Sequence, residues 1–86
     1  MYYVYVLHSE KDNNFYVGYS ENLKKRVKMH RAGEVKSTRN RRPLNLVYYE
    51  ASPNQEDALS REKYLKTSYG KRYIKNRLEN YLDEET

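Results

Sequence analysis

Cysteine is absent from this sequence of 86 residues, which excludes disulfide bonds and thiolate metal sites. A chain of this length is near the lower limit for independent folding and has room for one hydrophobic core. We therefore expect a single domain spanning residues 1–86. The lack of cysteine is also compatible with a reducing compartment, and we expect the protein in the cytoplasm.

Long apolar runs are missing as well, so no segment is suited to cross a membrane. Residues 2–7 form a strand-like segment that lacks the basic start and the long apolar stretch of a signal peptide. No internal repeat, linker or low-complexity tract divides the chain. We expect no membrane partner, no small-molecule cofactor and a monomer, with a protein partner as an open alternative.

Tryptophan does not occur and phenylalanine occurs once, whereas tyrosine occurs eleven times. Tyrosine combines a large apolar ring with a polar hydroxyl, so most of these residues are expected in strands and at the rim of the core. A given tyrosine becomes a candidate for chemistry only where its position adds an argument.

Positive charge dominates, with 17 lysines and arginines against 12 acids and a net charge of +5. Nine of the basic residues lie between Lys24 and Arg42, where Glu34 is the single acid, whereas the last eight residues contain four acids. Such an uneven field attracts a polyanion to one side of a protein. An anionic membrane is the alternative, but the basic segment lacks the bulky apolar face of an interfacial helix. The expected partner is DNA, with RNA not excluded.

Hydropathy patterns and turn residues predict an α+β domain of order ββαβαα, with a small sheet and three helices. Strands are expected at residues 2–8, 15–19 and 44–51, the first two as a hairpin. Helices are expected at residues 21–32, from the Ser52–Pro53 pair to about residue 67, and beyond residue 70. Ser20 and Ser52 are the expected N-caps. Gly33 and Gly70 are the expected helix stops.

Strand alternation places Tyr5 and Tyr16 together on one face of the hairpin, while the aliphatic positions pair over a core on the other. Gly18 shares the face of Tyr16, and a glycine inside a strand often marks close approach by a ligand or by backbone. The alternative is a structural cross-strand tyrosine pair beside a bulge.

Arg26 and His30 lie four residues apart and therefore share one face of the first helix, flanked by Lys24, Lys25 and Lys28. An arginine fork matches phosphate oxygens, and histidine titrates near neutral pH, so the pair could bind a phosphate. A snorkelling arginine and a structural histidine are the alternative.

Glu62 is spaced with Ala58 and Leu65 on the core side of the second helix. A carboxylate in that position is costly unless it is paired or bound to a metal. It could hold Mg²⁺, which commonly takes one or two protein carboxylates and keeps several waters. The alternative is a salt bridge to a neighbouring arginine or lysine.

The loop at residues 34–42 is basic and comes directly after a basic helix. It is predicted to bind along a phosphate backbone, with Ser37 and Thr38 as hydroxyl donors. A solvated loop is the alternative. The expected nucleic-acid contacts are Lys24, Lys25, Lys36, Arg39, Arg41 and Arg42.

Taken together, these patterns resemble the GIY-YIG nuclease domain over essentially the whole chain, and small stand-alone bacterial members above all. The resemblance rests on Val4-Tyr5-Val6, Tyr16-Val17-Gly18, Arg26, His30, Glu62 and the segments 38–43 and 58–63. The first tripeptide lacks the glycine of its motif, whereas both tyrosines and the second glycine are present. Many members carry an asparagine after the glutamate, and Asn76 matches that position only loosely.

The resemblance implies a three-stranded antiparallel sheet flanked by helices, and hydrolysis of DNA phosphodiesters with one divalent ion, Mg²⁺ or Mn²⁺. Tyr5 and Tyr16 would be the motif tyrosines, one of which activates or orients the attacking water. Arg26 would neutralise charge on the phosphate, and His30 would assist proton transfer. Glu62 would hold the metal.

Three functions follow as hypotheses. The first is a metal-dependent DNA endonuclease, structure-selective or weakly specific, with a role in DNA repair or recombination. The second is a nucleic-acid-binding module of the same fold without catalysis, which the basic segment alone would explain. The third is an interaction protein with a tyrosine-rich partner surface.

Overall fold

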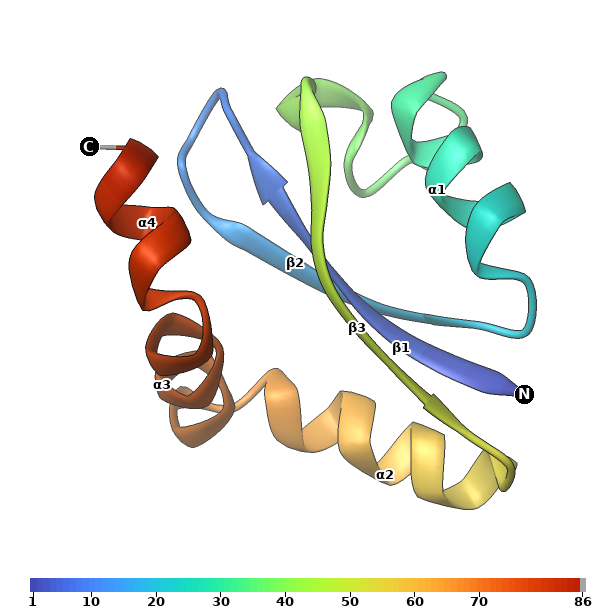
Figure 1. Ribbon diagram of the computed structural model, residues 1–86. Coiled ribbons are helices and arrows are strands. Elements are labelled where there is room, and N and C mark those ends of the chain that lie inside the picture. Colours follow the sequence, from blue (N-terminus) through green and yellow to red (C-terminus); the bar gives the residue numbers. More distant parts are fainter. Residues whose placement is uncertain (86) are drawn as a thin grey trace.

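The computed structural model of the protein describes residues 1–85, and residue 85 by its backbone alone. Thr86, which the expected domain includes, lies outside them. A three-stranded antiparallel sheet has the order β2-β1-β3, so that the first strand is central (Figure 1). The strands are β1 (Tyr2–Ser9), β2 (Phe15–Ser20) and β3 (Leu44–Ser52). This confirms the expected α+β class and the predicted hairpin.

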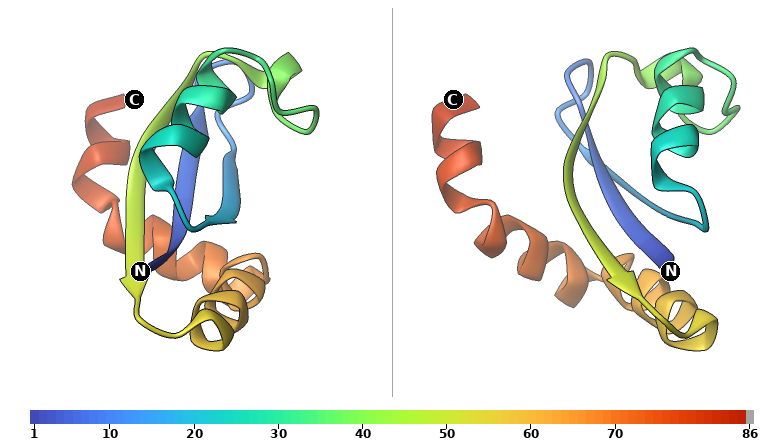
Figure 2. Two further views of the ribbon diagram at one scale, coloured as in Figure 1. Left: turned by 90° about the vertical axis from the view of Figure 1, so that its right-hand side faces the viewer. Right: turned by 45° about the vertical axis from the view of Figure 1, so that its right-hand side comes forward.

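Helices cover both faces of the sheet (Figure 2). The helix α1 (Leu23–Arg31) packs on one face, and α2 (Gln55–Leu65) and α3 (Ser68–Arg77) pack on the other, followed by α4 (Glu79–Glu85). A 3-10 turn, Arg39–Arg41, interrupts the basic loop before β3. Within residues 1–85 no helix combines the length and the apolar character that crossing a bilayer requires.

Alternation along β1 separates two apolar clusters. Val4 and Val6 pack with Val17, Leu65 and Ile74 on the side of α2 and α3. Tyr5 and Leu7 pack with Val27 and Leu44 on the side of α1. A central strand that is buried on both faces is expected to be apolar at nearly every position. On the face toward α1, one of these buried positions of β1 is Tyr5. The predicted division of the hairpin into two faces is therefore confirmed.

The N-caps of α1 and α2 each lie two residues later than expected. The Asn22 side chain accepts from the Lys25 N–H at 3.1 Å, and the Asn54 side chain accepts from the Asp57 N–H at 3.1 Å. The serines predicted as caps, Ser20 and Ser52, instead end their strands. Each serine hydroxyl accepts the N–H of the asparagine two residues on, at 3.0 and 3.3 Å. A repeated Ser-x-Asn turn thus joins strand to helix, because both residue types bind nearby backbone readily.

The prediction that Gly70 ends a helix is wrong. The break comes at Thr67, whose hydroxyl accepts the Gly70 N–H at 3.2 Å and caps α3. Gly70 lies in the first turn of α3, where a Cβ atom would stand 2.3 Å from both the Tyr64 carbonyl oxygen and Leu65 Cα. The glycine therefore allows α3 to cross close to the end of α2.

The final helical segment is also divided, since α3 ends at Arg77 and α4 begins at Glu79. Within residues 1–85 the structure has four α-helices, whereas three were expected. The buried His8 ties α4 to the hairpin. Its Nδ1 lies 2.7 Å from the Tyr81 hydroxyl and its Nε2 lies 2.7 Å from Asn13 Oδ1.

The close crossing of α2 and α3 generates a stability prediction. Replacing Gly70 with alanine improves helix propensity by about 1 kcal/mol, but it drives a methyl group into backbone that cannot rotate away. We expect Gly70→Ala to lower the free energy of unfolding by roughly 1–3 kcal/mol in urea denaturation. The control is Asn76→Ala, at an exposed position on the same helix. A stabilised Gly70→Ala variant would contradict the packing described.

Candidate active site

Tyr5 projects from the central strand toward α1, and its ring lies across Gly18 of β2, its register partner. A Cβ atom on residue 18 would stand 2.4 Å from both Tyr5 Cζ and the Tyr5 hydroxyl oxygen. The close approach predicted at Gly18 is thus made by the Tyr5 ring, whereas a ligand or backbone segment was expected. Gly18 leaves the space in which this ring is buried to 1% exposure.

Three buried polar groups form a chain behind that ring. The Tyr5 hydroxyl lies 2.7 Å from His30 Nε2, and His30 Nδ1 lies 2.7 Å from Thr38 Oγ1. His30 and Thr38 are fully buried. A neutral imidazole offers one donor and one acceptor, so the chain satisfies both ring nitrogens. His30 therefore connects the central strand, α1 and the basic loop.

Burial shifts the titration of this chain. The pKa of His30 is lowered to about 4, first by loss of solvation and then by the positive charge of nearby Arg26. Burial raises the pKa of Tyr5, and Arg26 opposes that rise. At neutral pH the chain is therefore uncharged, with a neutral phenol beside a neutral imidazole.

Tyr16 and Arg26 lie on the more open side of this chain. The Tyr16 ring meets the His30 ring edge to face, with centroids 5.2 Å apart, and Tyr16 is half-buried. The Ser37 hydroxyl donates to the Tyr16 hydroxyl at 3.4 Å. Arg26 is also half-buried, and its charge acts on both Tyr5 and His30. The structure thus brings together four of the five predicted catalytic residues on the α1 face of the sheet.

Glu62, the fifth, belongs to α2 and makes an ion pair with Lys66 at 3.1 Å. The salt bridge considered as the alternative for this carboxylate is therefore present. Its side chain keeps 20% exposure, which is more open than the core position that the helical spacing predicted. After burial and Tyr16, its negative charge is a further cause of the raised pKa of Tyr5, so the two groups are electrostatic neighbours.

A divalent ion at this site would have one carboxylate available to it, Glu62. Within the described residues no three histidine or acidic side chains gather as they would in a closed protein cage. Mg²⁺ does not need such a cage, because it is commonly bound through one or two carboxylates and retains several waters. Glu62 can serve as that single ligand once Lys66 is displaced.

The predicted phosphate contacts divide into two groups. Arg41 is paired with Asp12 at 2.7 Å. The Arg42 Nε donates to the Arg39 carbonyl at 3.0 Å, and the Arg42 guanidinium covers Gly33, whose φ is +78°. Both guanidinium groups are thus engaged in holding the basic loop in place. The remaining predicted contacts stay exposed, namely Lys24, Lys25, Lys36 and Arg39.

Thr38 was expected among the hydroxyl donors to phosphate, but its role is a different one. Thr38 is instead buried against His30, and the Thr38 N–H donates to the Val35 carbonyl at 3.1 Å. Val35, itself buried, was the available indication, because an isolated aliphatic residue in a basic loop predicts that the loop packs inward.

The lowered pKa of His30 predicts a pH dependence of stability. The pKa of His30 is 6.5 in the unfolded chain and about 4 in the folded protein. Between these two pH values the unfolded chain therefore binds more protons than the folded protein does. The free energy of unfolding is therefore highest above pH 6.5 and falls as the pH drops toward 4, by up to about 3 kcal/mol at ~1.4 kcal/mol per unit. Urea denaturation across this range measures the slope. Parallel profiles for wild type and His30→Gln would contradict the assignment.

The packing of Tyr5 on Gly18 predicts energetic coupling between the two positions. We expect Gly18→Ala to lower the free energy of unfolding by roughly 1–3 kcal/mol, because the new methyl group displaces the buried ring. In a protein that already carries Tyr5→Leu, Gly18→Ala should lower the free energy of unfolding only slightly. Leucine lacks the Cζ and hydroxyl atoms that the new methyl group would meet, and it keeps apolar volume. A double-mutant cycle measures the difference, and an equal cost in both backgrounds would refute the contact.

Comparison with known proteins places this geometry in a family. The GIY-YIG catalytic domain matches residues 1–82. A UPF0213 protein of Clostridium perfringens is 48% identical over 67 residues, covering 77% of this chain and 71% of the relative. A second, encoded in the ldhD 5' region of Pediococcus acidilactici, is 44% identical over 81 residues, covering 87% and 82%.

The solution NMR structure of a UPF0213 protein from Bacillus halodurans is similar in fold. It superposes with a TM-score of 0.54 at 35% identity and covers 86% of this chain and 82% of that one. The chain belongs to the GIY-YIG family of nuclease domains.

Proposed function

We propose that this protein is a metal-dependent endonuclease that hydrolyses DNA phosphodiester bonds, with a preference for DNA structure over sequence and a role in DNA repair or recombination. The observation that carries this proposal is the neutral Tyr5–His30 pair, which lies beside the positive charge of Arg26 and within electrostatic reach of Glu62. A purely structural tyrosine–histidine contact has no need of an arginine and a carboxylate around it.

In the proposed reaction Arg26 binds the scissile phosphate and stabilises the charge that develops on it. Tyr5 accepts a proton from the attacking water as it passes its own proton to His30 Nε2, with Nδ1–H donated to Thr38. Burial is the main cause of the low pKa of His30 and the charge of Arg26 is the second; the bound phosphate offsets only the second and in that way favours the transfer. Tyr16, with its partly exposed ring, orients the water.

Glu62 would hold the divalent ion, Mg²⁺ or Mn²⁺, in place of its ion pair with Lys66. When bound, such an ion supplies Lewis-acid polarisation of the phosphate and stabilisation of the leaving oxygen. Nucleases of this family generally need a metal, which agrees with the presence of this carboxylate.

A non-catalytic nucleic-acid-binding module is the second candidate. The Glu62–Lys66 ion pair favours it, since a carboxylate satisfied by a lysine has less affinity for a metal. The basic loop and helix would serve such a module equally well. Activity measurements separate the two candidates.

The test is cleavage of branched, flapped and single-stranded DNA in Mg²⁺ or Mn²⁺. We expect Arg26→Ala and Glu62→Gln each to lower the cleavage rate by about 100-fold or more, because each removes charge that the transition state needs. Lys63→Ala is the matched control, next to Glu62 and exposed on the same helix.

Chelation of the metal should abolish cleavage, and Lys63→Ala should leave the rate unchanged. Absence of cleavage on every substrate and in both metals, together with salt-sensitive DNA binding, would reject catalysis and establish the second candidate.

A further inference from the structure

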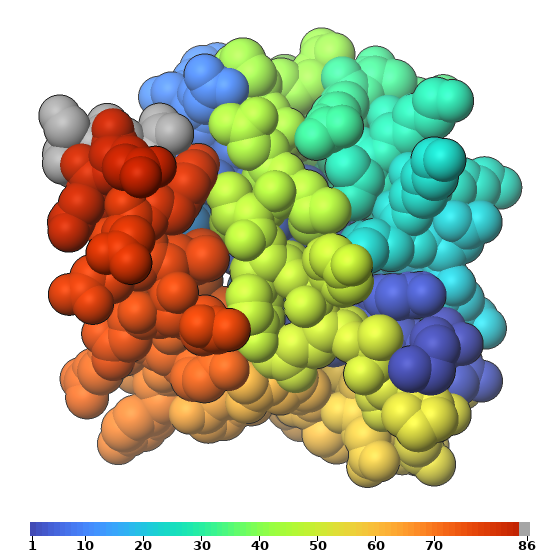
Figure 3. All heavy atoms as spheres, viewed as in Figure 1, coloured from blue at the N-terminus to red at the C-terminus, as the bar shows by residue number. Residues whose placement is uncertain are grey.

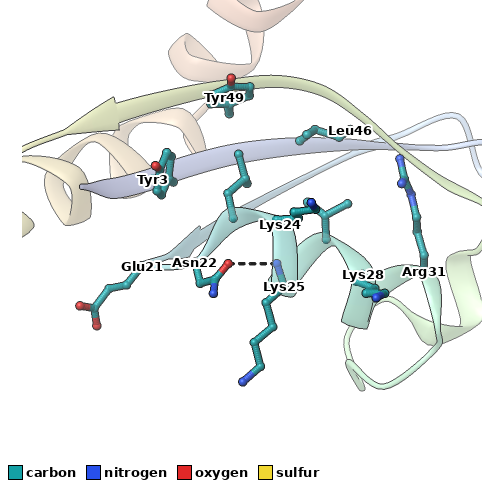
Figure 4. A pocket seen from close by; sticks show the side chains of 11 residues that line it. Tyr3, Glu21, Asn22, Lys24, Lys25, Lys28, Arg31, Leu46 and Tyr49 are labelled. Carbon is teal, nitrogen blue, oxygen red and sulfur yellow. Dashed lines mark hydrogen bonds between the residues drawn. The ribbon is translucent and has the colours of Figure 1, made fainter.

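A groove of about 960 Å³ runs between α1 and the outer strand β3 (Figure 4). It does not belong to the site described above, because neither Tyr5, Tyr16 nor His30 lines it. Leu23 and Val27 of α1 and Leu46 of β3 form its apolar lining. β3 runs along the middle of the face shown in Figure 3, with α1 beside it, so the groove opens to solvent on that face.

Basic side chains dominate the α1 wall of this groove. Lys24, Lys28 and Arg31 follow each other at helical spacing and line it together with Lys25, against a single acid, Glu21. Among the described residues none of these cations takes part in an ion pair. Arg31 extends from α1 toward β3 in Figure 4. The groove therefore presents uncompensated positive charge to an anionic chain.

Two tyrosines form the opposite wall. Tyr3 of β1 and Tyr49 of β3 meet edge to face with centroids 6.3 Å apart. Tyr49 is 54% exposed, although its ring is large and apolar. An exposed aromatic ring facing a row of lysines and arginines is the arrangement by which proteins bind unpaired nucleotides, with bases stacked on the ring and phosphates on the cations.

α1 lies between this groove and the proposed active site. Arg26 and His30 occupy the flank of the helix that faces Tyr16 of β2, and Lys28 and Arg31 occupy the flank that faces β3. One helix thus offers phosphate-binding groups in two directions. A substrate in which two strands part could place one strand on each flank.

We propose that the groove between α1 and β3 binds an unpaired DNA strand, with a base stacked on Tyr49 and phosphates held by Lys24, Lys28 and Arg31. The choice of DNA rests on the proposed function. The groove then supplies a preference for flapped or forked substrates, because a blunt duplex has no free base for Tyr49. The helix α1 would separate the strand that is bound from the strand that is cut.

The test is fluorescence anisotropy with a ten-nucleotide DNA strand and the full chain in EDTA, so that binding is measured without cleavage. We expect Tyr49→Thr, which keeps a strand-forming residue, to weaken binding about five-fold or more through loss of one stacked base. Lys28→Ala combined with Arg31→Ala should reduce the slope of log K against log salt by about 1.4, the value for two phosphate contacts on a single strand.

Matched controls lie on α3, away from the groove. Tyr69→Ala removes another exposed tyrosine, and Arg72→Ala combined with Arg77→Ala removes two other exposed cations. These variants should keep the wild-type affinity within about two-fold. Their change in the slope of log K against log salt should be smaller than that of the variant with Lys28→Ala and Arg31→Ala. Equal effects of the groove variants and the controls would overturn the proposal.

Two further probes sharpen the result. A blunt DNA duplex should bind more weakly than the strand, and equal binding would refute stacking on Tyr49. An RNA strand that binds more tightly than the matching DNA would refute the choice of DNA. Cleavage in Mg²⁺ is measured in parallel. If the groove variants lose DNA binding as expected but the wild-type protein cleaves no substrate, the proposed nuclease activity is refuted and the binding groove is established.

Discussion

The hydrogen bond between Tyr5 and His30 is the constraint around which the site is arranged. It spans the interior from the central strand to α1, and it can form only because residue 18 has no side chain in the path of the ring. The same histidine then fixes the basic loop through Thr38. Sheet, helix and loop are thus held in one geometry by groups that would each be costly to bury alone.

This arrangement makes the two faces of the sheet chemically different. The face under α2 and α3 is closed by apolar side chains such as Val6 and Leu65, which form one of the two buried clusters. The face under α1 carries polar groups among its apolar contacts. Four of the five catalytic candidates and the groove lie on this second face, on opposite flanks of α1, whereas Glu62 belongs to α2.

The sequence allowed the strands, the hairpin and the shared face of Tyr5 and Tyr16 to be predicted, because these depend on periodicity alone. The helix starts at Asn22 and Asn54 were missed, since a serine and an asparagine two residues apart are equally plausible caps until the turn is seen. Gly70 was misread because its role depends on how close α3 comes to α2. Thr38 was misassigned for the same kind of reason, because its contact with His30, eight residues earlier, forms only when the loop folds back against α1.

Glu62 reaches the site from a different part of the chain than its partners. The other members of the site lie within the first 38 residues, whereas Glu62 arrives with α2, the helix that also covers Val4 and Val6. The α2 residues Ala58 and Leu65 are buried in the same cluster as Val4 and Val6, so Glu62 reaches its position near Tyr5 only when α2 packs against that core.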